Sequence, residues 1–150
     1  MGRFEFLESQ LEGPKEEILS EKPQTYDANY YYQLADKQFK EGDYEGALRS
    51  YSRALNEDPN LVDAWVGEVR CLIELGELEE ARTWVNKGLE LFPESAEMLS
   101  VKSWVLARTY GLEDALKLTD KAITKKGPSR FVWLARGFVL LYTDSKNAAI

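Results

Sequence analysis

Apolar residues recur at helical spacing in two consecutive stretches near the middle of the chain. Residues 62–75 and 78–92 each carry apolar side chains three or four positions apart. Such spacing places these side chains on one face of an amphipathic helix. Gly76 separates the two stretches and Pro93 follows the second, as a tight turn and a helix end require. The pattern therefore predicts a helical hairpin.

Four kinds of position recur at a single interval of 34 residues. They are a glycine at Gly42 and Gly76, a small residue at Ala47, Ala81 and Ala115, a second small residue at Ala54, Gly88 and Ala122, and a proline at Pro59 and Pro93. Chance composition rarely supplies four columns that share one spacing without a gap. The columns therefore predict that the hairpin is an internal repeat.

A repeated hairpin of this length resembles the tetratricopeptide repeat (TPR). The resemblance rests on the columns above, on the run 42–44 (Gly-Asp-Tyr), and on aromatic residues near the start of three of the four first helices, at Tyr31, Trp65 and Trp133. We assign Trp65 and Trp133 to the core. The resemblance implies an all-α fold, a right-handed solenoid of stacked helical hairpins with three full repeats and a partial fourth. The full units would be residues 28–61, 62–95 and 96–129, and the partial unit residues 130–150.

The small residues have a physical role in such a stack. Two helices reach the short end of the usual separation of about 8 to 10 Å only where the contacting side chains lack bulk. We expect Ala47 and its counterparts where the second helix crosses the first, and Ala54 and its counterparts where it meets the next repeat. A large residue at either place should overpack the contact, at a cost of about 1–3 kcal/mol.

Three parts of the chain depart from the repeat. In the third unit the glycine comes one residue late, at Gly111, which predicts an altered turn and an extended first helix. In the fourth unit the apolar stretch 130–142 is followed by eight residues, so its second helix is expected to be missing or short. Residues 1–27 lie outside the period and are either a helical cap on the first unit or a disordered leader.

The composition limits the kinds of functional site that the chain can form. The chain has 26 acidic and 19 basic residues, a formal charge of −7, and no histidine. An excess of acid disfavours nucleic-acid binding, and the absence of histidine removes the commonest general base and metal ligand. Its single cysteine, Cys71, falls in an apolar helical pattern and is expected to be a buried, inert thiol. We therefore expect no catalytic residue, no metal and no cofactor, and the paired carboxylates are interpreted as solvated helix faces.

No stretch has the length and apolar character of a signal peptide or a membrane span. The sequence therefore predicts a protein without a membrane association, located in the cytoplasm.

The resemblance to TPR proteins also implies a concave groove lined by the first helix of each unit. The positions that would face it are Asn29, Tyr32, Asp36, Lys40, Asp63, Val66, Arg70, Glu74, Glu97, Ser100, Trp104, Arg108, Leu134 and Phe138. Tyrosine, tryptophan and arginine often carry the binding energy of interfaces. We predict that a protein or peptide partner contacts Asn29, Tyr32, Asp36, Arg70, Trp104 and Arg108.

Some TPR domains hold the C-terminal carboxylate of chaperones with a clamp of lysine, asparagine and arginine. At the matching positions this chain has Tyr32, Asp36, Gly67, Glu97 and Val101. None of these supplies the donors of the clamp, and Asp36 and Glu97 would repel a carboxylate. The sequence therefore argues against this class of partner.

The stretch 130–142 is apolar around its whole circumference, with Arg136 as the charge inside it. Such a helix needs burial on more than one side. Three arrangements would cover it: further repeats in a longer protein, self-association, or a docked partner. The residues expected on this face are Leu134, Phe138, Leu140 and Leu141.

Two functions remain open at this stage. The first is a non-catalytic interaction module that presents a groove to a peptide or helix, either alone or as the N-terminal part of a longer protein. The second is a structural homo-oligomer, for example a homodimer, that assembles through the helix at residues 130–142.

Overall fold

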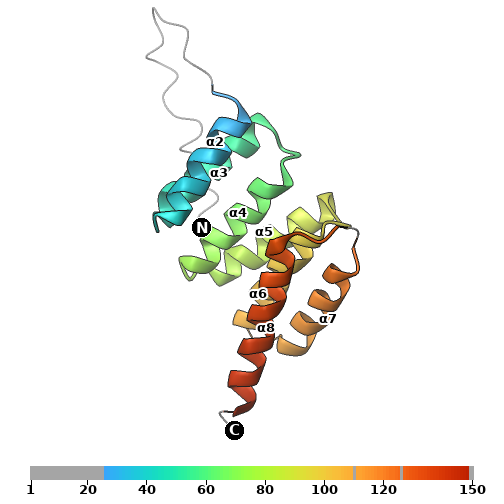
Figure 1. Cartoon of the computed structure of the whole chain (residues 1–150). Coiled ribbons are helices and arrows are strands. Elements are labelled where there is room, and N and C mark those ends of the chain that lie inside the picture. Colours follow the sequence, from blue (N-terminus) through green and yellow to red (C-terminus); the bar gives the residue numbers. More distant parts are fainter. Residues whose placement is uncertain (1–25, 110, 126, 149–150) are drawn as a thin grey trace, which may run out of the picture.

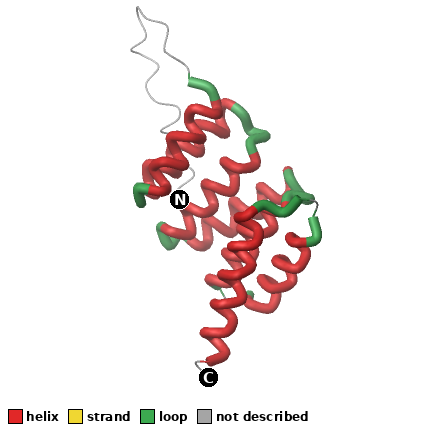
Figure 2. Tube along the Cα trace, in the orientation of Figure 1, coloured by secondary structure: helices red, strands yellow, loops and turns green. Residues whose placement is uncertain are grey.

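The computed structural model describes residues 26–109, 111–125 and 127–148. Every regular element in these ranges is a helix, as Figure 2 shows. The helices are α2 (Ala28–Lys40), α3 (Tyr44–Glu57), α4 (Val62–Glu74), α5 (Leu78–Leu91), α6 (Ala96–Arg108), α7 (Leu112–Ile123) and α8 (Arg130–Ala148). The choice between a cap and a leader concerns residues 1–25, which lie outside the described part of the chain.

Helix positions keep the repeat of the sequence. The first helices begin at Ala28, Val62, Ala96 and Arg130, and the second helices at Tyr44, Leu78 and Leu112, with 34 residues between successive members of each series. The pairs α2–α3, α4–α5 and α6–α7 follow one another along the molecule, with α8 beside α6 and α7 at one end (Figure 1). The predicted all-α solenoid of helical hairpins is confirmed.

The first two hairpin turns depend on glycine. Gly42 and Gly76 have φ angles of 84° and 78°, in the left-handed region that side chains other than glycine rarely enter. In the first turn, Asp43 then caps α3 by accepting a hydrogen bond from the Gly46 backbone N–H at 2.9 Å. This bond satisfies one of the N–H groups that the first turn of a helix leaves without a partner.

The third turn differs from the first two, but the expected extension of its first helix is wrong. α6 ends at Arg108 and has 13 residues, the same length as α4. Thr109 leaves the helical conformation, with φ −103° and ψ −148°, and Gly111 precedes α7 as its N-cap residue with a φ of −103°. The late glycine therefore changes the local turn and leaves the register of the helices unchanged.

The last helix is longer than the sequence pattern indicated. Residues 143–148 continue α8 to a length of 19 residues, and its C-terminal turns extend past α7 in Figure 1. The described residues contain no second helix after it. Its inner side is buried, with Val132, Ala135 and Val139 each at most 1% exposed.

The small-residue columns lie at buried helix contacts, as expected from their size. Ala47, Ala81, Ala115, Ala54 and Ala122 are all 0% exposed, and Gly88 is buried. A Cβ atom added at Gly88 would collide with the Met98 side chain of α6, which belongs to the next hairpin. A side chain at Gly88 would therefore require the Met98 side chain to shift at the contact between neighbouring hairpins.

The two tryptophans assigned to the core have different environments. Trp65 is 8% exposed, stacks on Trp84 with ring centroids 4.6 Å apart, and donates from Nε1 to the Pro59 carbonyl at 2.9 Å. Trp133 is 53% exposed, so its assignment to the core is wrong. Trp84 belongs to the second helix of the same hairpin, and the described residues supply no such helix to cover Trp133.

Candidate functional site

A cavity of about 150 Å³ lies between the first helices of the hairpins; we call it the Arg70 cavity. Its lining comes from α2, α3, α4, α6 and the start of α8, which are far apart in the sequence. The lining residues are Tyr32, Asp36, Tyr51, Asp63, Val66, Gly67, Arg70, Glu97, Ser129 and Phe131. Tyr32, Asp36 and Arg70, three of the predicted partner contacts, therefore share one site.

Arg70 lies between two aromatic rings. Its guanidinium carbon is 4.5 Å from the centre of the Phe39 ring of α2 and 5.1 Å from the centre of the Phe131 ring of α8. Cations are attracted to the faces of aromatic rings in this range. Arg70 on α4 thus links the first helices of the first and fourth units, and this contact holds its charge at the cavity.

The aromatic surface continues from Phe131 along α6 and α8. The Trp104 ring lies 6.4 Å from Phe131 and 5.0 Å from Phe138, measured between centroids. Asp36, Arg70, Trp104 and Phe138 occupy the same position in successive units, 34 residues apart. This column therefore changes from charged at α2 and α4 to aromatic at α6 and α8.

Negative charge outweighs positive charge around the Arg70 cavity. The pKa of the Asp63 carboxyl is raised, first by burial and then by the nearby charge of Glu97. The pKa of Tyr32 is also raised by burial and by Asp63 and Asp36, while Arg70 opposes the shift. Lys40 pairs with Asp36 at 2.9 Å on the surface of α2. Asp63 and Glu97 also face the cavity, and neither forms an ion pair with a basic residue in the described part of the chain.

The other predicted contacts lie elsewhere. Asn29 is exposed in the first turn of α2 and Arg108 is exposed at the end of α6, and neither lines the cavity. Trp104 is half-buried and joins the site through its contact with Phe131.

Sequence reasoning did not assign Phe131 or Ser129 to the groove. The repeat contained the signal for Phe131, since Asn29, Asp63, Glu97 and Phe131 form one column at the 34-residue interval. Extending this column into the fourth unit assigns Phe131 to the groove. Ser129 belongs to the connection before α8, where the sequence offers no periodic pattern.

The exposed side of α8 is apolar. Trp133, Leu134, Phe138, Leu140 and Leu141 are between 42% and 68% exposed. The matching residues of α4 are buried. Leu72, which corresponds to Leu140, is 0% exposed, and Ile73, which corresponds to Leu141, is 4% exposed. The repeat thus places residues suited to burial on a surface that nothing in the described part of the chain covers.

The thiol of Cys71 lies in the core. Cys71 is fully buried, as expected, and burial raises the pKa of its thiol, so the reactive thiolate is disfavoured. Among the described residues there is no group of three or more histidine, cysteine, aspartate or glutamate side chains placed to hold a metal ion. None of the described helices combines the length and apolar character needed to cross a bilayer.

Comparison with known proteins gives the family. A family model described as tetratricopeptide repeat matches residues 38–105, which includes the Arg70 cavity residues of α4 and α6. The chain contains tetratricopeptide repeats. A TPR repeat-containing protein of Methanocaldococcus jannaschii is 28% identical over 120 residues, which are 73% of this chain and 21% of that protein. This TPR chain therefore spans about a fifth of the length of that relative.

Solved TPR domains have the same fold. The first TPR of Spaghetti (RPAP3), bound to the HSP90 peptide SRMEEVD, has a TM-score of 0.64 at 17% identity, covering 83% of this chain and 94% of that one. The TPR2B domain of yeast Sti1, in a complex with pHsp70, has a TM-score of 0.63 at 18% identity, covering 76% and 96%. At these identities the likeness concerns the fold. TPR domains are generally non-catalytic protein-interaction modules.

Proposed function

We propose that this TPR chain is a non-catalytic interaction module that binds a peptide or helix of a partner protein in a groove. The groove runs from the Arg70 cavity to Trp104 and Phe138. The observation that carries the proposal is the meeting of Tyr32, Asp36 and Arg70 at one cavity between the first helices. The peptides bound by related TPR structures support a peptide as the ligand.

The groove offers two kinds of contact. At one end, Asp63 and Glu97 favour a partner with neutral or basic side chains. At the other end, Trp104 and Phe138 present aromatic area to an apolar side chain. Such anchors contribute strongly to interfaces because they bury large areas. We therefore propose a partner segment with an apolar anchor and without an acidic C-terminal tail.

The test compares partners captured by the wild-type protein and by groove variants from a lysate of cells that express it. Trp104→Ala should lose the partner at an unchanged mass, while Lys121→Met, on an exposed residue of α7, should retain it. Circular dichroism during heating establishes that both variants are folded. Equal recovery of every partner by Trp104→Ala and wild type would contradict the proposal.

A second candidate function is self-assembly through α8. The exposed apolar side chains of this helix favour it, because monomeric proteins rarely expose large contiguous apolar patches. A dimer through α8 should lose mass in light scattering on Leu140→Glu and keep its mass on Trp104→Ala. A protein that is monomeric at all concentrations would exclude this function. It would favour instead a docked partner, or a further hairpin in a longer polypeptide.

We propose the unit bounds 28–61, 62–95 and 96–129 with a partial unit at 130–150 as the repeats of the module. The face formed by Leu134, Phe138, Leu140 and Leu141 is proposed for self-association or for a missing repeat. A cytoplasmic location also stays a prediction.

A further inference from the structure

The repeat gives three equivalent joints between successive hairpins. At the first and third joints, a residue of a second helix bonds to a residue 16 positions later, on the first helix of the next unit. At the second joint, the two corresponding residues line one cavity. The three pairs of positions are Ser52 and Glu68, Asn86 and Lys102, and Asp120 and Arg136. The repeat thus allows the same place in the fold to be compared three times.

The first joint is closed by its own side chains. Ser52 Oγ donates a hydrogen bond to Glu68 Oε1, and Glu68 is 1% exposed. Leu48 at this joint is 0% exposed, and Trp84 also favours the ionised form of the Glu68 carboxyl. Bulky and polar groups of the chain therefore fill this joint.

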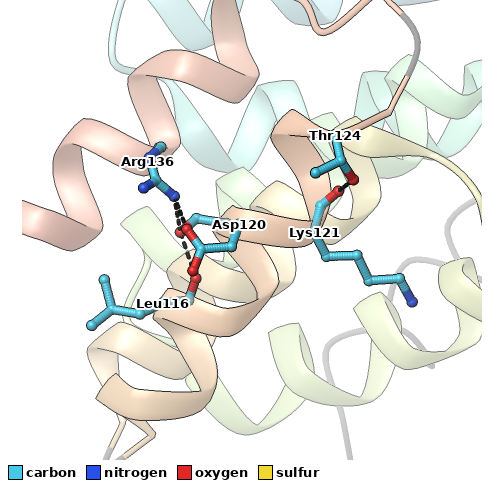
Figure 3. Close-up of polar contacts among 6 residues, drawn as sticks. Leu116, Asp120, Lys121, Thr124 and Arg136 are labelled. Atoms are coloured by element: carbon cyan, nitrogen blue, oxygen red, sulfur yellow. Dashed lines mark hydrogen bonds and ion pairs between the residues drawn. The ribbon is translucent and has the colours of Figure 1, made fainter.

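The third joint is closed by an ion pair. Arg136 Nη1 pairs with Asp120 Oδ1 and also donates to Thr119 Oγ1 at 3.1 Å. Figure 3 shows the guanidinium of α8 pointing at the Asp120 carboxylate of α7. The basic residue at this joint thus has an acidic partner within the chain.

The second joint is open. A cavity of about 360 Å³, which we call the Lys102 cavity, lies between α5, α6 and α7. Leu118 stands at the position of Trp84, and Arg82 at the position of the buried Leu48. Leu118 is smaller than Trp84, which leaves space at this joint, and the exposed Arg82 replaces a buried leucine. The lining residues are Arg82, Val85, Asn86, Lys102, Val105, Leu106, Asp114, Lys117 and Leu118.

Positive charge predominates in this cavity, although the whole chain has a formal charge of −7. Arg82, Lys102 and Lys117 line it together with one carboxylate, Asp114. Lys117 pairs with Glu113 at 3.4 Å. Arg82 and Lys102 make no hydrogen bond or ion pair with any described residue, and Lys102 is half-buried. Asn86 corresponds to Asp120 in the repeat. Asp120 neutralises Arg136 at the third joint, whereas Asn86 carries no charge.

We propose that the Lys102 cavity binds a small anion that carries phosphate or carboxylate groups. Arg82 and Lys102 supply positive charge to this cavity, and Asn86, which also lines it, is neutral where the third joint has the carboxylate that pairs with Arg136. Arginine binds both kinds of anion through two parallel N–H donors, and lysine acts as a point charge. The site is separate from the Arg70 cavity, so it does not depend on the proposed function.

The test is a titration of the whole chain with pyrophosphate and with citrate, at constant ionic strength, followed by NMR of its backbone amides. Saturable shifts of lining residues of α5, α6 and α7 are expected, with dissociation constants below about 10 mM. Pyrophosphate alone producing them identifies a phosphate site, and citrate alone a carboxylate site. Lack of saturation with both anions would overturn the proposal.

Two variants separate this site from general charge attraction. Lys102→Met removes the charge and keeps the length of the side chain, and should weaken binding at least about fivefold. Lys121→Met removes a basic residue of α7 that does not line the cavity, and should change the affinity less than about twofold. If Lys102→Met fails to fold, Arg82→Gln, on an exposed residue, serves the same purpose. Equal weakening by the variant at Lys121 and the cavity variant would contradict a specific site.

Discussion

At the scale of single residues, close approach between helices depends on the absence of side chains. A Cβ atom at Gly67 of α4 would lie 2.5 to 2.7 Å from carbon atoms of the Tyr51 ring of α3. A Cβ atom at Gly137 of α8 would have no neighbour within 4 Å. The same substitution should therefore have opposite effects at these two helical positions.

Gly67→Ala should destabilise the protein by about 1–3 kcal/mol, because the Tyr51 ring must move out of a packed interface. Gly137→Ala should stabilise it by up to about 1 kcal/mol, since alanine favours the helix and meets no obstacle. Urea unfolding of both variants measures the two values. A Gly67→Ala variant as stable as the wild type would contradict the packing described for α3 and α4.

Glu68 predicts a pH dependence of stability. Burial raises the pKa of its carboxyl to about 8, against smaller opposing contributions from Ser52 and Trp84. In an unfolded chain the pKa is about 4.3. Between these values the native state keeps a proton that the unfolded chain has lost, so this residue lowers stability progressively from about pH 4.3 to pH 8.

Glu68→Gln removes this titration. Its free energy of unfolding relative to the wild type should increase between about pH 5 and 8, with a slope on the order of 1 kcal/mol per pH unit. Glu90→Gln, on an exposed residue of α5, is the control and should follow the wild type. Urea unfolding at several pH values gives the comparison, and parallel profiles for wild type and Glu68→Gln would refute the raised pKa.

The sequence predicts some of these residues better than others. The buried alanines recur at one interval, and a small residue at such a position indicates a close contact between helices. Their burial can therefore be predicted from the sequence. Glu68 shares its column with Lys102 and Arg136, and a charged residue in a helical pattern is normally interpreted as exposed. Its burial arises from Ser52 and Trp84 on other helices, which no local pattern connects.

At the scale of helices, the ends are determined by caps as well as by periodicity. Asp43 should matter for α3 because its carboxylate accepts from the Gly46 backbone N–H. Asp43→Ala should cost about 1 kcal/mol of unfolding free energy, while Asp43→Ser, which retains a capping oxygen, should cost less than half of this. Urea unfolding measures both. Equal losses in the two variants would show that capping does not explain the role of Asp43.

The two errors at this scale have physical causes. The late Gly111 suggested a longer α6, but the packing of Ala115 at 0% exposure keeps α7 in register, so the change is confined to the turn. The apolar residues of α8 identified a helix correctly. Trp133 keeps the repeat spacing of the aromatic position. Burial of that position also needs a second helix in the same unit, and the described residues contain none after α8.

At the scale of the whole molecule, the groove's charge should select among peptides. The HSP90 peptide SRMEEVD, bound by the Spaghetti TPR, is acidic at its C-terminal end. Asp36, Asp63 and Glu97 around the Arg70 cavity should repel it. Calorimetric titration should give a dissociation constant above about 1 mM for this peptide. Micromolar binding would show that the acidic lining does not determine specificity.

The resemblance to TPR proteins predicts both the fold and the residues on the inner side of the first helices, because each position of the repeat has a fixed place in a solenoid. The Arg70 cavity required the structure, since Phe131 reaches Arg70 from a helix more than sixty residues later in the chain. The Lys102 cavity required it too, because its space and its charge depend on how the residues of one joint differ from those of the other two. Sequence periodicity thus locates surfaces and does not show which of them are open.

The central claim is that a partner binds between the first helices, and NMR mapping tests it most directly. A peptide taken from a captured partner is titrated into the labelled protein. The amide and side-chain signals of Tyr32, Arg70 and Trp104 should shift in a saturable way, and Trp104→Ala should weaken the affinity by at least about tenfold. Shifts confined to the exposed face of α8, with these three residues unaffected, would contradict the account.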